Sequence, residues 1–188
     1  MSEQSGSDSI KPILEAGSSA DRLAALLDAA GLAYALIGGH AVNAWFVPRF
    51  TNDVDFLVAP SAELISRFEE AASALGYDYE RRQDEGGASG PDFLRMVDSQ
   101  GNAFDIQTAK TDYQMLVLER AVRSEPEGVL VATPEDLLIL KLIANRSKDR
   151  GDLLNLVARN GLDWQYIDQW AEIWDVTERL RAIRLLAD

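Results

Sequence analysis

The sequence predicts a mixed α/β or α+β fold, with a small mixed or largely antiparallel sheet flanked by helices and a helical C-terminal part. Helical and extended patterns alternate up to Val131, with a hairpin pattern around 98–101, and only helical patterns follow. The length of 188 residues fits one domain, or one domain with a small helical appendix. We expect residues 1–20 to form a mobile tail with the start of a helix, 21–132 the core, and 133–188 a helical region packed on that core.

Apolar spacing and stop residues define the elements of the first half. Leu23, Leu26 and Leu27 recur at helical spacing before Gly31, a residue type that commonly ends helices. Pro48 ends the next helix, because the residue before a proline avoids the helical conformation. These signals predict helices at 21–30, 40–46 and 61–75, and strands at 33–37 and 53–58.

Turn residues and helix caps organise the second half. Thr133-Pro134-Glu135-Asp136 combines a capping threonine, a proline in the first turn and two acids. Asp163 caps a last helical region, whose tryptophans (Trp164, Trp170 and Trp174) either pack that region on the core or form a partner surface. We expect strands at 77–80, 92–97, 103–107 and 129–131, a glycine-rich loop at 81–91, helices at 112–122, 134–145 and 148–159, and a helical region from 164 that closes with 178–186.

Composition narrows the functional classes. A net charge of −13 argues against broad, nonspecific binding of nucleic acid and leaves room for a basic partner protein. The absence of cysteine excludes disulfides and thiolate metal sites. No apolar run approaches the roughly 18 residues that span a bilayer, and the polar first residues contain no apolar signal core. We therefore expect a cytoplasmic protein with no membrane partner.

Asp53 and Asp55 lie two residues apart on a predicted strand. Both carboxylates therefore face one side of the sheet, with Cα atoms about 6.5–7 Å apart. Two carboxylates at this spacing can bind a divalent cation or a pair of cations. Asp105 is a third acid within an apolar strand; if the two strands are neighbours, it either shares the metal or takes the proton from an attacking hydroxyl. The alternative is an exposed edge strand with solvated acids.

Gly38-Gly39 separates a predicted strand from a predicted helix. Glycine lets the backbone approach a ligand closely, and a helix N-terminus offers free N–H groups to phosphate. A simple tight turn is the alternative. His40, the only histidine, either contacts a nucleotide or substrate or is satisfied by hydrogen bonds at the helix start.

Lys141 lies on the apolar face of the helix predicted at 134–145. A lysine there either extends its ammonium group to solvent or points into a cleft at a negative group, and we favour the cleft. The segment 146–152 that follows is dense in both charges. It forms either a solvated turn with local ion pairs or a corner that faces a triphosphate.

These residues resemble the nucleotidyltransferase superfamily with the DNA polymerase β-like fold. Its pattern is a Gly-Gly or Gly-Ser turn, an Asp-x-Asp or Asp-x-Glu about a dozen residues later, and a third acid on a later strand. Gly38-Gly39, Asp53-Val54-Asp55 and Asp105 match that order and spacing. The stretches Gly-Gly-His-Ala, Pro-Arg-Phe-Thr-Asn-Asp-Val-Asp and Thr-Pro-Glu-Asp-Leu-Leu-Ile-Leu-Lys-Leu are most similar to abortive-infection AbiEii-type nucleotidyltransferases and their uncharacterised bacterial relatives.

The resemblance implies a metal-dependent enzyme that moves a nucleoside monophosphate from a nucleoside triphosphate (NTP) to an acceptor hydroxyl and releases pyrophosphate. It implies a toxin–antitoxin or phage-defence setting, and an acceptor that is RNA, a protein or a small molecule. The implied metal, Mg²⁺ or Mn²⁺, would be bound by Asp53, Asp55 and Asp105. The implied catalytic residues are Asp53, Asp55, Asp105 and Lys141. The implied nucleotide-binding residues are Gly38, Gly39, His40, Arg49, Thr51 and Asp149, with Asp152 as the alternative to Asp149.

Two alternatives remain open at this point. One is a relative with weak or lost activity that serves as a binding module or antitoxin. The other is a small-molecule nucleotidyltransferase similar to the aminoglycoside and lincosamide enzymes, whose cationic acceptors suit an acidic chain. One departure from the superfamily pattern is Gly39, where many members have a serine whose hydroxyl positions a terminal phosphate; backbone N–H groups are left for that contact.

Overall fold

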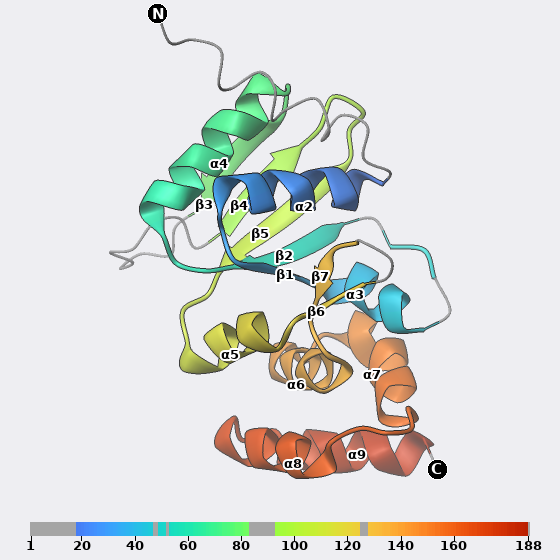
Figure 1. Cartoon of the computed structure of the whole chain (residues 1–188). Helices are drawn as coiled ribbons and strands as arrows, with labels where there is room; N and C mark the ends of the chain where they lie inside the picture. Colours follow the sequence, from blue (N-terminus) through green and yellow to red (C-terminus); the bar gives the residue numbers. More distant parts are fainter. Residues whose placement is uncertain (1–17, 47–48, 52, 83–92, 125–127, 188) are drawn as a thin grey trace, which may run out of the picture.

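The computed structural model describes residues 18–46, 49–51, 53–82, 93–124 and 128–187. Within these residues, seven strands form one mixed sheet in the order β3-β4-β5-β2-β1-β7-β6 (Figure 1). A mixed sheet flanked by helices confirms the predicted fold class. The strands are β1 (Tyr34–Ile37), β2 (Val54–Val58), β3 (Asp78–Arg82), β4 (Phe93–Val97), β5 (Ala103–Thr108), β6 (Val122–Arg123) and β7 (Leu130–Val131).

Strand pairing brings three charged residues into one row. β2 pairs with β5 in parallel, with Asp55 opposite Asp105. β4 pairs with β5 antiparallel, with Arg95 opposite Asp105. Directly opposite residues project from the same face of a sheet, so Arg95, Asp105 and Asp55 share one face. β2 lies inside the sheet between β5 and β1, so it is not an edge strand.

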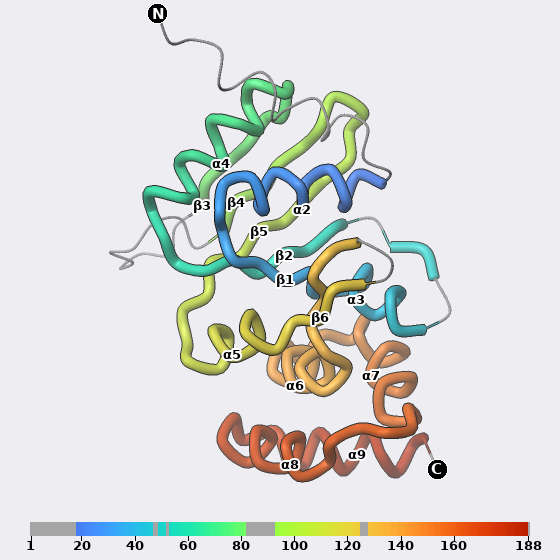
Figure 2. Tube along the Cα trace, in the orientation of Figure 1, coloured from blue at the N-terminus to red at the C-terminus, as the bar shows by residue number. Residues whose placement is uncertain are grey.

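Helices cover both faces of the sheet (Figures 1 and 2). α2 (Ser19–Ala30) and α4 (Ala62–Ala74) pack against each other on one face, where Leu23, Leu26 and Leu27 are buried as their spacing predicts. On the other face, α3 (Gly38–Trp45) packs against β1, β2 and α6 (Pro134–Ala144), and α5 (Asp112–Arg120) against β1 and β2. The face that carries α3 and α6 is the one that positions the candidate site.

The C-terminal helices continue from the core without a break. After α6 come the 3-10 turn η1 (Ser147–Asp149), α7 (Arg150–Val157), α8 (Trp164–Ile173) and α9 (Thr177–Ala187), with α8 and α9 forming a layer beyond α6 and α7 (Figure 1). The tryptophans of α8 pack partly buried against the core, as the Tyr113 and Trp170 ring centroids, 4.4 Å apart, illustrate. None of the described helices is both long and apolar enough to cross a membrane.

Buried Asp136 ties the C-terminal helices to the core. Its carboxylate accepts hydrogen bonds from Tyr166 at 2.5 Å, from Thr133 at 2.7 Å and from Tyr113 at 3.2 Å. Arg120 supplies the positive charge at 3.1 Å. These donors come from α5, α8 and the cap of α6, so one carboxylate joins three helices.

Three predicted elements differ from the structure. The helix predicted at 112–122 ends at Arg120, because Ala121 turns to ψ 137° and Val122 then pairs with Val131 as a short strand. The segment predicted as one helix at 148–159 divides into η1 and α7. The helix predicted from His40 begins at Gly38, so the glycine pair forms its first turn. The predicted tail up to residue 17, Pro48 and residues 83–91 of the predicted loop lie outside the described residues.

Candidate active site

Gly38 and Asp55 meet where β1 ends. Gly38 has a φ of +69°, in the left-handed region that favours glycine. A Cβ atom at this position would lie 2.7 Å from Cγ of Asp55, so any side chain there would displace the carboxylate. The turn therefore requires glycine both for its backbone conformation and for the close approach of Asp55.

The Asp55 carboxylate lies among other acids with incomplete compensation. Burial, and then the charge of Asp105, raise the pKa of Asp55 to about 6. Asp53 acts in the same direction, while Arg146 and Lys148 oppose it. Negative charge at this point of the sheet is therefore costly in the free protein, which favours the binding of a cation.

Arg95 connects two of the three predicted acids. Its guanidinium lies 3.1 Å from Oδ1 and 3.3 Å from Oδ2 of Asp105, and 3.5 Å from Oδ1 of Asp53. The sequence interpretation missed this residue. The signal was present, because a hairpin with its turn near residue 100 places Arg95 opposite Asp105.

The side chains of the three predicted acids are not arranged to coordinate one metal ion together. Among the described residues, no three His, Cys, Asp or Glu side chains converge closely enough to hold a metal ion. The structure does place Asp55 beside Asp105, as predicted for neighbouring strands. Asp53 lies immediately before β2, which begins at Val54 rather than at the predicted residue 53, and its side chain is 42% exposed, whereas that of Asp105 is 14% exposed.

Lys141 is the centre of a second, buried ionic cluster. Its ammonium group lies 2.8 Å from Asp149 and 2.8 Å from Asp152. Arg49 forms a bidentate ion pair with Asp152, in which Nε lies 2.7 Å from Oδ1 and Nη2 lies 2.5 Å from Oδ2. Nε of Arg146 lies 2.6 Å from Oδ2 of Asp149. Lys141 thus points inward at negative groups, and these groups are carboxylates of the chain itself.

The cations of this buried cluster hold its carboxylates in the charged form. Burial alone would raise the pKa of Asp149 and of Asp152. Hydrogen bonds from Arg146 and Lys141 to Asp149, and from Arg49 and Lys141 to Asp152, outweigh burial and bring both pKa values below the ordinary value. Each acid therefore has two cationic partners, unlike Asp55.

Arg49 and Thr51 belong to a segment that packs on the glycine turn. Asn43 of α3 donates to the carbonyl of Arg49 at 2.7 Å and accepts from its N–H at 3.1 Å. A Cβ atom on Gly39 would lie 2.7 Å from Oγ1 of Thr51, so this glycine too allows a close approach. Burial lowers the pKa of His40, although a hydrogen bond to the Thr51 backbone opposes the shift. The predicted residues Gly39, His40, Arg49 and Thr51 are therefore neighbours in space.

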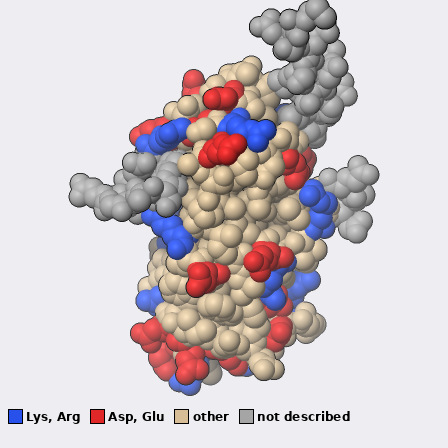
Figure 3. All heavy atoms as spheres, turned by 60° about the vertical axis from the view of Figure 1, so that its left-hand side comes forward, with Lys and Arg blue, Asp and Glu red and all other residues tan. Residues whose placement is uncertain are grey.

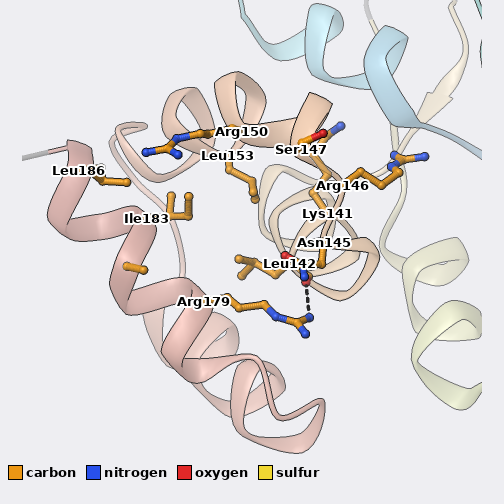
Figure 4. Close-up of a pocket in the computed structure, with 11 residues that line it drawn as sticks. Lys141, Leu142, Asn145, Arg146, Ser147, Arg150, Leu153, Arg179, Ile183 and Leu186 are labelled. Atoms are coloured by element: carbon orange, nitrogen blue, oxygen red, sulfur yellow. Dashed lines mark hydrogen bonds between the residues drawn. The ribbon is translucent and has the colours of Figure 1, made fainter.

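Within the part of the chain that the structure describes, two cavities adjoin these clusters. A small cavity of about 110 Å³ lies between the sheet and α6, and Gly38, Asp55, Lys141 and Arg146 are among the residues that line it. A larger cavity of about 450 Å³ also borders Lys141 and Arg146 (Figure 4). The described residues that line it include cations and apolar side chains and no acid: Lys141, Leu142, Asn145, Arg146, Ser147, Arg150, Leu153, Arg179, Ala182, Ile183 and Leu186.

The basic lining of the larger cavity contrasts with the acidic chain around it. The net charge is −13, and on the face shown in Figure 3 acidic and basic side chains are scattered in small groups with uncharged surface between them. A cavity whose charged lining residues are all cationic is therefore a local departure from the composition. Such a lining suits a negatively charged ligand with an apolar or aromatic part.

The fold around this site is that of nucleotidyltransferases. The lincomycin-bound lincosamide antibiotic adenylyltransferase LnuA has a TM-score of 0.53 and 15% identity, over 80% of this chain and 96% of that chain. At this identity the likeness shows the fold alone. An antigenic nucleotidyltransferase-like protein from Paracoccidioides brasiliensis has a TM-score of 0.49 and 19% identity, over 95% of this chain and 93% of its own.

The sequence also identifies the family. Residues 22–164, well over half of the chain, match the model of the family described as nucleotidyl transferase AbiEii toxin, type IV toxin–antitoxin system. The chain therefore belongs to the AbiEii nucleotidyltransferase family, as its motifs predicted. A comparison with curated proteins finds no match.

Proposed function

We propose that this protein is a metal-dependent nucleotidyltransferase that moves a nucleoside monophosphate from an NTP to an acceptor hydroxyl. The observation that supports this proposal most is the meeting of Gly38, Asp55 and Asp105 beside a cavity that α6 closes with Lys141 and Arg146. The glycine turn offers close backbone approach for phosphate, and the first N–H groups of α3 have no helical acceptor. Asp55 and the basic side chains of Lys141 and Arg146 then line one cavity from two sides.

Asp53 and Asp55 are the residues we propose for binding Mg²⁺ or Mn²⁺. Mg²⁺ is typically bound by one or two carboxylates together with substrate phosphates and water, so a three-carboxylate cage is not required. The raised pKa of Asp55, caused by burial and by neighbouring acids, supports this assignment, because a bound cation would stabilise the ionised carboxylate. When bound, the metal would neutralise charge on the triphosphate and favour displacement at the α-phosphorus.

In the proposed reaction, the acceptor hydroxyl oxygen forms a bond to the α-phosphorus as the bond from that phosphorus to the β-bridging oxygen breaks. Pyrophosphate leaves with the electron pair of the broken bond. Asp105 takes the proton of the hydroxyl, because it is a carboxylate on the strand beside Asp55 and Arg95 orients it. Arg146, which lines the small cavity with Asp55, offers charge to the phosphates.

We assign Lys141 and Asp149 an indirect role in nucleotide binding. Both are buried, and Lys141 is bound to Asp149 and Asp152 rather than directed at Asp55. Asp152 in turn holds Arg49, whose segment carries Thr51 against Gly39. Through this chain of contacts, α6 and α7 would fix the position of the phosphate-binding turn.

The sizes of the two cavities suggest which part of a bound nucleotide each would hold. The small cavity, at about 110 Å³, lies well below the roughly 300–1,000 Å³ of typical ligand sites. The adjoining cavity, at about 450 Å³, lies within that range and has apolar side chains beside its cations. We therefore place reacting phosphates at the small cavity, and the base and ribose at the larger one.

Membership of the family makes a toxin–antitoxin setting in the cytoplasm, where NTPs are available, part of the same proposal. The partner would be an antitoxin or a substrate macromolecule. RNA, a protein and a small molecule remain the three acceptor classes, since none of the residues described here selects among them.

Nucleotide titration tests the proposed function. ATP, GTP, CTP and UTP are each titrated with Mg²⁺ into the wild-type protein and into Asp53→Asn, with binding followed by calorimetry. We expect at least one nucleotide to bind the wild type at or below millimolar concentration, and more weakly to the variant. Absence of binding to the wild type would contradict the enzyme assignment, and equal binding by Asp53→Asn would contradict the metal assignment.

A further inference from the structure

Arg95 occupies the position of a counter-cation in the acidic cluster. Its guanidinium contacts both oxygens of Asp105, at 3.1 and 3.3 Å, and approaches Asp53 at 3.5 Å. β4 delivers this side chain from the strand next to β5, on the face that Asp105 and Asp55 share. Arg95 is therefore a positive charge built into the group of acids proposed to bind metal.

We propose that Arg95 is an internal substitute for the metal, which a divalent cation must displace from Asp53 when it binds. This inference rests on the proposed function, because it concerns the same carboxylates. Arg95 lies within ion-pair distance of Asp53 and Asp105, whereas Asp55 has no ion pair with a described residue. In the free protein, Arg95 lowers the repulsion between the acids and holds Asp105 in place while the metal is absent.

The charge of Arg95 should lower the affinity of the acidic cluster for a metal ion. A metal that binds Asp53 must break the 3.5 Å contact with Arg95 and must also approach a fixed positive charge. Both effects weaken metal binding in the wild type. Removal of the charge should therefore strengthen metal binding, although it removes an ion pair from the free protein. A purely structural role for Arg95 predicts a loss of stability with no gain in metal affinity.

The test measures binding of Mn²⁺ alone, by electron paramagnetic resonance, to the full chain without nucleotide. We expect Arg95→Gln to bind Mn²⁺ more tightly than the wild type, on the order of tenfold. Arg95→Lys keeps the charge without the planar fork, and its affinity should fall between the two. Arg123→Gln is the matched control, because it removes the same charge from the opposite edge of the sheet and should leave affinity unchanged.

Thermal melting gives a second readout that does not depend on activity. In EDTA, Arg95→Gln should melt at a lower temperature than the wild type. In buffer without EDTA, added Mn²⁺ should raise the melting temperature of Arg95→Gln by more than it raises that of the wild type. Suppose that the wild type binds Mn²⁺ and that Asp53→Asn does not. Unchanged or weaker Mn²⁺ binding by Arg95→Gln would then overturn this inference and leave the metal assignment intact. If neither the wild type nor Arg95→Gln binds Mn²⁺ alone at millimolar concentration, this inference fails, whereas the metal assignment itself is tested by the nucleotide titration of Asp53→Asn.

Discussion

Two ionic clusters lie on either side of the small cavity and differ in how their charges are balanced. Around Lys141, Asp149 and Asp152 each have two cationic partners at 3.4 Å or less, and their pKa values lie below the ordinary value. Across the cavity, Asp55 lies beside Asp105, and its pKa is raised to about 6 by burial and by its acidic neighbours. The charges of the first cluster are balanced within the chain, whereas on the proposed function a bound cation would balance those of the second.

On the proposed function, this difference separates the charges that serve structure from those that serve chemistry. A buried carboxylate whose partners are all internal contributes to a fixed geometry. A carboxylate whose ionised form is destabilised in the free protein favours a ligand that restores the balance. Neutralising Asp55 in one cluster and Asp152 in the other should therefore change stability with opposite signs.

The largest effect is expected from Lys141→Met, which leaves Asp149 and Asp152 with one cationic partner fewer in a buried setting. The free energy of unfolding should fall by about 3–5 kcal/mol, as is usual when a buried ion pair loses one member. Urea denaturation measures it. Lys148→Met removes the same charge from an exposed side chain in η1 and should change stability by no more than about 0.5 kcal/mol. Similar losses in the two variants would show that the buried cluster is not structural.

Gly38→Ala should have the next largest effect, a loss of about 2–4 kcal/mol in the free energy of unfolding. The new Cβ would be strained by the φ of +69° and would overlap the Asp55 carboxylate. Gly31→Ala separates these causes, because Gly31 has a φ of +72° but no atom within 4 Å of an added Cβ. It should lose only about 1 kcal/mol. Equal losses would mean that Asp55 moves aside without cost.

Asp55→Asn should stabilise the metal-free protein. The folded-state pKa of about 6 lies above the ordinary value of 3.8 for this carboxyl, so between these values the folded protein binds more protons than the unfolded chain. Ionisation of Asp55 therefore lowers stability progressively from about pH 4 to pH 6, and the loss is complete above pH 6. At pH 7 in EDTA, the variant should gain about 1–3 kcal/mol over the wild type.

Two comparisons check the Asp55 prediction. The advantage of Asp55→Asn should disappear at pH 4, where the wild-type carboxyl is protonated in the folded state. Asp152→Asn should lower stability at pH 7, because its carboxylate is held charged by Arg49 and Lys141. Denaturation curves for the three proteins at both pH values provide the measurement. Destabilisation by Asp55→Asn at pH 7 would remove the contrast between the clusters.

The smallest effect concerns the larger cavity. Arg150→Gln should weaken nucleotide binding by about two- to fivefold, since one exposed charge beside the proposed base and ribose site is lost. Arg184→Gln is the control, because Arg184 lies on α9 over the ring of Trp164 and does not line the cavity. Calorimetric titration of both variants measures the change. Equal affinities would place the nucleotide elsewhere.

Much of the fold could be predicted because its signals are local. Apolar spacing predicted α2, and the Thr133-Pro134 cap predicted the start of α6. Short β6 was missed because Val122 continues a helical pattern and becomes a strand only through its pairing with Val131. That preference comes from a distant segment, so the local sequence around Val122 does not contain it.

The sequence predicted individual residues of the candidate site but not the contacts between them. Gly38 and Asp55 could be named from motif spacing, but their direct contact depends on the pairing of β1 with β2. Lys141 was correctly predicted to point at negative charge. Its partners could not be identified, because the break between η1 and α7 sets the positions of Asp149 and Asp152. The contact of Arg95 with Asp105 could be predicted only from the pairing register of the hairpin.

The parallel pairing of β2 with β5 has a consequence for the order of folding. Asp55 and Asp105 face each other across the centre of the sheet although they lie 50 residues apart in the chain. Contacts between distant segments form slowly, because a long loop must close before they gain any stability. A growing chain that ends before β5 contains Gly38, Asp53 and Asp55 but lacks the strand that carries Asp105. The acid pair is therefore absent from any shorter nascent chain, and by the proposed mechanism activity cannot precede its formation.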